Sequence, residues 1–192
     1  MNRLIIAALA AAVLSPATAR ADEETPDTAF VFTDEIVIPV TSVKDQNKSG
    51  TCWCFSGTSF FENEIRKAGG DSLDLSEMFT VYHCYLDKAD RYVRMYGNAN
   101  FAAGGSIMDV PYVWRRYGAV PEEVYRGLCY GEDKHVHGEL DGELAAIVDV
   151  VTKKPNKKIS PAWKKAFEGV LEAYLGKLPE KFTYKGKEYT PQ

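Results

Sequence analysis

Cys52 lies where a polar, glycine-containing loop gives way to a segment with helical periodicity, and Gln46 precedes it by six residues. A thiolate can attack a carbonyl carbon, and the N-terminus of a helix favours the negative charge that a thiolate carries. The side-chain amide of Gln46 and the unpaired N–H groups of the first helical turn could donate to the oxyanion that forms. The pair predicts a cysteine acyl-transfer site, with Cys52 as the nucleophile and Gln46 as the oxyanion donor.

Cys54 offers two other interpretations of the same segment. A cysteine next to an aromatic residue is often simply a small buried side chain. Cys52 and Cys54 could instead form a redox pair, although thioredoxin-type motifs have two intervening residues and a helix points these two side chains apart. No metal site and no cofactor are expected, because zinc would need further Cys or His residues at regular spacing.

The surrounding sequence must supply a loop and a helix that hold Cys52 and Gln46 together. Thr41 to Thr51 is polar and predicts the loop, whereas the Val, Ile and Phe residues of Phe30 to Val40 predict extended chain or an edge strand. The apolar spacing from Cys52 onward predicts a helix that ends at Gly69-Gly70. Further helices are expected at about 76–96, 107–117, 139–152 and 160–175, and a hairpin at about 182–189.

Two of these helices carry start signals. Asp74 and Glu77 have the spacing of a capping box at the start of the second helix. Ser160 as N-cap, followed by Pro161 at the first helical position, predicts the start of the last helix. In the third helix Pro111 is expected to delay the start or bend the helix, and Gly118 to end it.

Residues 1–21 have the pattern of a secretory signal peptide. Arg3 gives a positive start, 4–14 is an unbroken apolar run, and Ala19-Arg20-Ala21 is a small-x-small cleavage site. The run is too short to span a bilayer, and no later stretch approaches the ~20 apolar residues that a span needs. The pattern predicts a secreted or periplasmic protein without a membrane span.

The charge of the mature chain argues against nucleic acid as a partner. Removal of residues 1–21 takes two of the 23 basic residues and leaves all 27 acidic ones. Nucleic-acid binding depends on basic side chains that neutralise phosphates, so an acidic chain of this kind is a poor candidate. Its 45% hydrophobic and 12% aromatic content also excludes a disordered chain.

Four segments, in order, resemble the papain-like cysteine peptidases. Gln46 followed after five residues by Cys52-Trp53-x-Phe55-Ser56 resembles the nucleophile signature of that family. Leu75-Ser76-Glu77 resembles the start of the family's second helix, and Gly104-Gly105 its paired glycines. The segment 117–121, Tyr-Gly-Ala-Val-Pro, resembles a turn found especially in the bleomycin hydrolase (aminopeptidase C) branch. Together the matches span residues 43–130.

The resemblance implies an α+β papain-like fold in which the mostly helical, cysteine-bearing half is present and the β-rich half is missing. Cys52 would be the nucleophile, Gln46 the oxyanion donor, and Trp53 would pack beside them. Gly104 and Gly105 would line the substrate cleft, where a residue without Cβ lets another backbone approach. The implied partner is a peptide substrate, the implied activity is aminopeptidase-like, and homo-oligomerisation is left open.

The sequence departs from the family in its cysteines. Secreted members carry a disulfide between positions that are Ser49 and Ala102 here, so that bridge is absent as a unit. Cys84 and Cys129 could pair in an oxidising compartment or could both be free.

The family's histidine is expected at about residues 182–202, and the sequence offers only His83, His135 and His137. We therefore expect an N-terminal portion of a peptidase that lacks the catalytic His and Asn and is inactive by itself. The expected boundaries are 1–21 signal peptide, 22–51 leader, edge strand and oxyanion loop, 52–178 helical half, and 179–192 hairpin. The alternative is a secreted, non-catalytic papain-like module that binds or inhibits.

Overall fold

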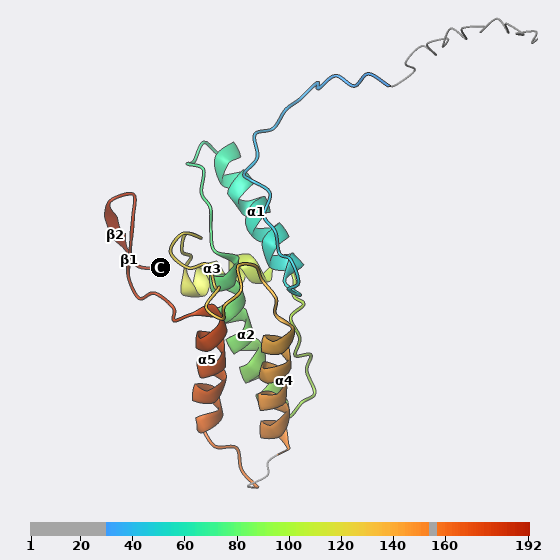
Figure 1. Ribbon diagram of the computed structural model, residues 1–192, viewed down its shortest axis with the longest axis vertical. Helices are drawn as coiled ribbons and strands as arrows, with labels where there is room; N and C mark the ends of the chain where they lie inside the picture. The colour runs from blue at the N-terminus through green and yellow to red at the C-terminus, as the bar shows by residue number, and fades with distance from the viewer. Residues whose placement is uncertain (1–29, 154–156) are drawn as a thin grey trace, which may run out of the picture. The chain divides into compact units, whose positions relative to one another are not determined.

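The computed structural model describes residues 30–153 and 157–192. Its elements confirm the predicted order of helices followed by a hairpin (Figure 1). The proposed signal peptide, 1–21, lies outside the described residues and stays a prediction. The helices are α1 Cys52–Lys67, α2 Glu77–Arg94, α3 Asp109–Tyr117, α4 Gly138–Thr152 and α5 Ala162–Leu175, and the strands are β1 Phe182–Tyr184 and β2 Lys187–Tyr189.

Helix α2 is the centre of the core, because it packs against each of the other four helices. Helices α4 and α5 also pack against each other, as Figure 1 shows. The fully buried apolar side chains come from all five helices; among the largest are Phe79, Phe167, Met78, Leu140 and Leu144. Burial of this apolar surface is the main stabilising contribution to the fold.

Two predicted helix caps are wrong, although both helices begin within two residues of the expected positions. Helix α2 is capped by Ser76, whose hydroxyl accepts a 3.0 Å hydrogen bond from the Phe79 N–H, and Glu77 is the first helical residue. The Asp74–Glu77 capping box does not form, because both carboxylates bind Lys44 instead. Helix α5 begins at Ala162 after Pro161, and Ser160 does not cap it.

Of the two alternatives predicted for Phe30 to Val40, extended chain or an edge strand, the edge strand is not found. Residues 30–37 form a unit of the chain separate from 38–192, and no strand is found in 30–40. The large apolar side chains of 30–37 and of 38–40 are exposed, Phe32 at 88% and Val40 at 63%. A strand needs a neighbour to pair its backbone, and within the described residues none pairs with this segment. The carbonyl of Val40 instead accepts a hydrogen bond from Arg66 on α1.

The hairpin around Lys185-Gly186 is confirmed. Strands β1 and β2 are antiparallel, with Phe182 opposite Tyr189. In the part of the chain that the structure describes, this ladder is the only sheet, and two isolated bridges join loops. The fold is therefore helix-rich, as expected for the cysteine-bearing half of a papain-like domain.

Within residues 30–153 and 157–192, no helix combines the length and the apolar character needed to cross a membrane.

Candidate active site

The loop that carries Gln46 is fixed to the segment before α4. Lys48 forms a parallel bridge with Val136: the Lys48 N–H donates to the His135 carbonyl at 2.9 Å, and the His137 N–H donates to the Lys48 carbonyl at 3.2 Å. Asn47 turns the chain at a φ of 46°, and its side-chain amide also donates to the His135 carbonyl. These contacts attach the Gln46 loop to the segment just before α4.

Lys44 fixes the start of the same loop to both α1 and α2. Its ammonium lies 2.8 Å from Glu62 Oε1, 2.8 Å from Glu77 Oε1 and 3.0 Å from Asp74 Oδ1. Burial alone would lower the pKa of Lys44, but the charge of Glu77 and the hydrogen bonds to the three carboxylates raise it above its ordinary value. Because Glu62 and Glu77 are buried, the cation is needed to compensate their charge.

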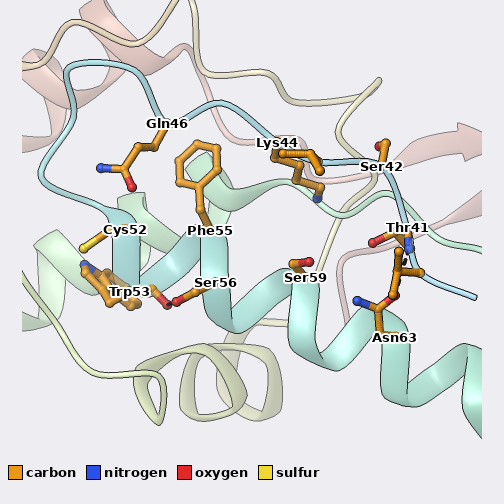
Figure 2. Close-up of a pocket in the computed structure, with 12 residues that line it drawn as sticks. Thr41, Ser42, Lys44, Gln46, Cys52, Trp53, Phe55, Ser56, Ser59 and Asn63 are labelled. Carbon is orange, nitrogen blue, oxygen red and sulfur yellow. Dashed lines mark hydrogen bonds between the residues drawn. The ribbon is translucent and has the colours of Figure 1, made fainter. Parts of the chain in front are cut away.

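Cys52 is the first residue of α1, and its thiol is exposed. It lines a groove of about 560 Å³ together with Gln46, Trp53 and Phe55; the walls are completed by Val40 to Lys44, Ser56, Ser59 and Asn63. Figure 2 shows the Gln46 side chain extending from the loop toward Cys52. The structure thus brings the predicted nucleophile and the predicted donor to one end of one groove.

The Gln46 amide is held by one hydrogen bond. Its Nε2 donates to the Ser49 carbonyl at 2.8 Å, which uses one of its two hydrogens. The other hydrogen remains for a ligand. The backbone N–H of Cys52 belongs to the first helical turn, whose donors have no acceptor within the helix. Two donors are therefore available near the thiol.

Trp53 connects the nucleophile helix to the paired glycines. It is 7% exposed, and its indole nitrogen donates to the Ala103 carbonyl at 2.9 Å. A Cβ on Gly105 would lie 2.6 Å from the Trp53 ring, whereas a Cβ on Gly104 would meet nothing within 4 Å. Neither glycine lines the groove of Cys52. Gly105 instead packs against the ring of Trp53, which does line that groove.

The cysteines do not support a redox pair. All four are free thiols, so Cys84 and Cys129 are not bridged either. Cys54 is fully buried and its sulfur lies 3.4 Å from the Glu77 carbonyl oxygen, in the core rather than in the groove. Burial raises the pKa of Cys54 well above its ordinary value. Cys54 is a core residue, as one of the sequence alternatives held.

None of the three histidines lines the groove of Cys52 in the part of the chain that is described. His83 stacks on the Tyr117 ring at 4.1 Å, and His135 packs edge-on against Phe55. His137 is fully buried against His135 and Tyr130. Burial lowers the pKa of all three to about 4. Among the described residues no group of three His, Cys, Asp or Glu side chains could hold a metal.

The sequence prediction missed Lys44 and Glu62. A signal for Glu62 was present, since Glu62 follows Phe55 and Thr58 at the spacing of one helix face, and that face of α1 is buried. Nothing in the spacing of Lys44 indicated its partners, because they come from segments far along the chain.

The fold and the groove define a papain-like domain with a cysteine at the start of its first helix. Residues 30–164 match the papain family of cysteine proteases, and the chain belongs to that family. It is 30% identical to pro-cathepsin H of Medicago truncatula over 112 residues, which cover 55% of this chain and 29% of that protein. It is 37% identical to cathepsin K of Gallus gallus over 65 residues, covering 29% of this chain and 20% of that one.

The fold is shared with a solved structure. The crystal structure of PepW from Lactobacillus rhamnosis HN001 aligns with a TM-score of 0.54 and 22% identity, over 83% of this chain and 44% of that chain. The chain spans less than half the length of each of these three proteins.

Proposed function

We propose that this chain carries the nucleophile of a cysteine peptidase, with Cys52 attacking the peptide carbonyl and Gln46 donating to the oxyanion. The observation that supports this most is that Cys52 and Gln46 line the same groove at the N-terminus of α1. Membership of the papain family gives the reaction class.

The proposed reaction has three steps: attack by the thiolate, loss of the amine, and hydrolysis of the thioester. The thiolate of Cys52 forms a C–S bond to the carbonyl carbon while the carbonyl electron pair moves to oxygen, where the Gln46 amide and the Cys52 N–H donate to it. Collapse of this intermediate breaks the C–N bond, and the amine leaves with a proton. Water then attacks the thioester carbonyl, the C–S bond breaks, and the carboxylic acid is released as the thiol is regenerated. The proton carrier in this proposal is a histidine other than His83, His135 and His137, because none of these three lines the groove.

The substrate in this proposal is a peptide whose backbone lies along Gly104 and Gly105, beside Trp53. The proposed aminopeptidase preference rests on the resemblance of 117–121 to the bleomycin hydrolase branch. Homo-oligomerisation is proposed from the family resemblance. Export is proposed from the signal-peptide pattern of residues 1–21. The boundaries at 51 and 178 are likewise proposals.

The first step can be tested without a proton donor by using an activated substrate. An N-acyl amino acid p-nitrophenyl ester has a leaving group that departs without protonation, so the full chain should form an acyl thioester visible by intact-mass spectrometry. Added imidazole should accelerate acylation as an external base. In a Cys129→Ser background, which removes the other exposed thiol, Cys52→Ser should form no thioester, and Gln46→Ala should slow acylation by about 100-fold. Thioester formation that survives in Cys52→Ser in this background would refute the assignment.

The aminopeptidase preference needs a separate comparison. An aminoacyl ester with a free amino group and the same ester with an N-acetyl group present the same carbonyl to Cys52. If the site prefers a free N-terminus, the first ester should acylate faster. Equal rates, or a faster acetylated ester, would contradict the preference without affecting Cys52.

A non-catalytic peptide-binding module is the second candidate, favoured by the absence of a histidine from the groove among the described residues. In that case the ester would leave Cys52 unmodified even with imidazole. A fluorescent peptide would still bind, and Gly105→Ala would weaken its binding.

A further inference from the structure

Lys88 on α2 contacts the loop that carries the paired glycines. Its ammonium donates to the Ala102 carbonyl at 3.2 Å and to the Gly104 carbonyl at 2.5 Å. It also lies 5.4 Å from the centre of the Trp53 ring and 6.0 Å from that of Tyr85. Within the described residues no carboxylate forms an ion pair with Lys88, so its hydrogen bonds go to the loop backbone rather than to an acidic side chain.

Three successive carbonyls of this loop are held by side chains from two helices. Lys88 binds those of Ala102 and Gly104, and the Trp53 indole binds that of Ala103 between them. Hydrogen bonds from a charged donor are stronger than those between neutral groups. The orientation of these three peptide groups is therefore fixed by Trp53 from α1 and by Lys88 from α2.

The direction of the Gly105 amide follows from this arrangement. In a trans peptide the C=O and the next N–H point in opposite directions. Because the Gly104 carbonyl points at Lys88, the Gly105 N–H points away from Lys88. A Cβ placed on Gly104 would meet no atom within 4 Å, so a second backbone could approach this part of the loop.

A close contact also holds the glycine loop to the segment before α1. Gly50 packs so closely on Ala103 that a Cβ on Gly50 would lie 2.5 Å from the Ala103 Cβ. The glycine loop is thus attached by a cation and a close contact.

We propose that Lys88 is a positioning residue for peptide substrates: by binding the Ala102 and Gly104 carbonyls, it orients the Gly105 amide toward the substrate backbone. This inference rests on the proposed function, in which a peptide lies along Gly104 and Gly105. Lys88 touches neither the thiol nor the scissile bond, so it acts on the recognition of the peptide backbone and not on the chemistry of Cys52.

The test compares two reagents that share one reaction. Chloroacetamide and a dipeptidyl chloromethyl ketone both lose chloride as the Cys52 sulfur forms a C–S bond, but only the second has a peptide backbone to place against the glycines. Rates are measured by intact mass in a Cys129→Ser background, which removes the other exposed thiol. The wild-type background should react faster with the peptidyl reagent.

Lys88→Met should lower the rate of the peptidyl reagent by about ten-fold, the loss expected for one misplaced hydrogen bond, and leave the chloroacetamide rate within about two-fold. Lys88→Arg keeps a charged donor and should retain most of the preference. Lys181→Met, which removes an exposed lysine paired with Glu188, is the matched control and should change neither rate. Should Lys88→Met not fold, as judged by thermal unfolding, Lys88→Gln keeps an uncharged N–H donor group and should give an intermediate loss.

The outcomes separate the two proposals. A Lys88→Met protein that keeps the full peptidyl preference, or loses both rates equally, would overturn the role of Lys88 alone. A wild-type background with no preference for the peptidyl reagent would overturn the proposed function and the positioning role with it.

Discussion

The Trp53 indole nitrogen donates a 2.9 Å hydrogen bond to the Ala103 carbonyl, so the residue beside the candidate nucleophile and the glycine loop are fixed to each other. The same ring occupies the space in which a Gly105 Cβ would lie, 2.6 Å away, and leaves Gly104 open. The two neighbouring glycines therefore have different roles: Gly105 allows Trp53 to pack, and Gly104 keeps the surface clear.

Alanine at each glycine should separate these roles. Gly105→Ala forces the Trp53 ring to move and should destabilise the protein by about 1–3 kcal/mol. Gly104→Ala meets nothing within 4 Å and should leave the free energy of unfolding within about 0.5 kcal/mol of wild type. Urea unfolding followed by tryptophan fluorescence measures both. Equal destabilisation by the two variants would contradict the packing of Gly105 on Trp53.

The close contact of Gly50 with Ala103 predicts a compensating pair. Gly50→Ala would bring two Cβ atoms to 2.5 Å and should destabilise the protein by about 1–3 kcal/mol. Ala103→Gly removes one of those atoms, so the double variant should recover most of the loss. A double-mutant cycle by urea unfolding gives the coupling energy. Additive effects of the two substitutions would show that the residues do not touch.

Lys44 is expected to matter more for stability than any exposed lysine. Lys44→Met leaves Glu62 and Glu77 buried without a cation, and removal of one partner from a buried ion pair costs about 3–5 kcal/mol. Lys181→Met removes a pair whose side chains are 66% and 67% exposed, and should cost at most about 1 kcal/mol.

A second variant separates charge from packing at Lys44. Adding Glu62→Gln and Glu77→Gln to Lys44→Met removes the two uncompensated charges and should recover part of the stability. If the triple variant is instead less stable than Lys44→Met, removing the two carboxylate charges brings no recovery. The two carboxylates would then not depend on Lys44.

The helices and the Cys52–Gln46 pair could be predicted because their signals are local. Apolar spacing marked α1 to α5, and a polar loop followed by a helix placed Cys52 at a helix start. The helix caps were harder, because Asp74 and Glu77 suit a capping box but bind Lys44 more favourably in the folded chain. Local propensity was overridden there by a tertiary ion pair.

The loop contacts of the candidate site could not be predicted from spacing. Lys88 reaches Ala102 and Gly104 across a separation in sequence that follows no helical or strand period. The Lys48–Val136 bridge likewise joins segments whose proximity depends on how α4 packs on α2. The edge-strand alternative for Phe30 to Val40 failed for a related reason, since β-branched residues favour a strand only where a partner is in place.

His137 should make stability depend on pH. It is fully buried, neither ring nitrogen has a hydrogen-bond partner among the described residues, and burial lowers its pKa to about 4. The unfolded chain takes up the proton near pH 6.5 while the folded chain does not, so this contribution to stability is lost as the pH falls from about 6.5 toward 4.

Substitution of His137 isolates that contribution. His137→Leu replaces the imidazole with an apolar side chain of similar size that cannot be protonated. Between pH 7 and pH 5 the wild-type protein should lose about 2 kcal/mol more than the variant. Urea unfolding at the two pH values measures both losses. If wild type and His137→Leu lose the same stability, the folded protein already accommodates a protonated His137.

The four cysteines should divide into two reactive and two protected thiols. Cys52 and Cys129 are exposed, while Cys54 and Cys84 are 0% and 6% exposed. The thiolate is the species that reacts, and burial raises the pKa of Cys84 to about 11 and that of Cys54 well above its ordinary value. A disulfide reagent such as DTNB at pH 8 should therefore modify two thiols rapidly in the native protein and four after unfolding in urea.

Single substitutions identify which thiols react. Cys52→Ser and Cys129→Ser should each remove one fast equivalent, and Cys54→Ala should remove none until the protein unfolds. The same samples address the redox alternative, because Cys54 faces the Glu77 carbonyl in the core and cannot reach Cys52 without opening α1. Oxidation with diamide should therefore produce no loss of two hydrogens within the native chain. A bridge that forms in wild type and disappears in both Cys52→Ser and Cys54→Ala would show that the start of α1 opens readily, and the fixed position of the nucleophile would then be wrong.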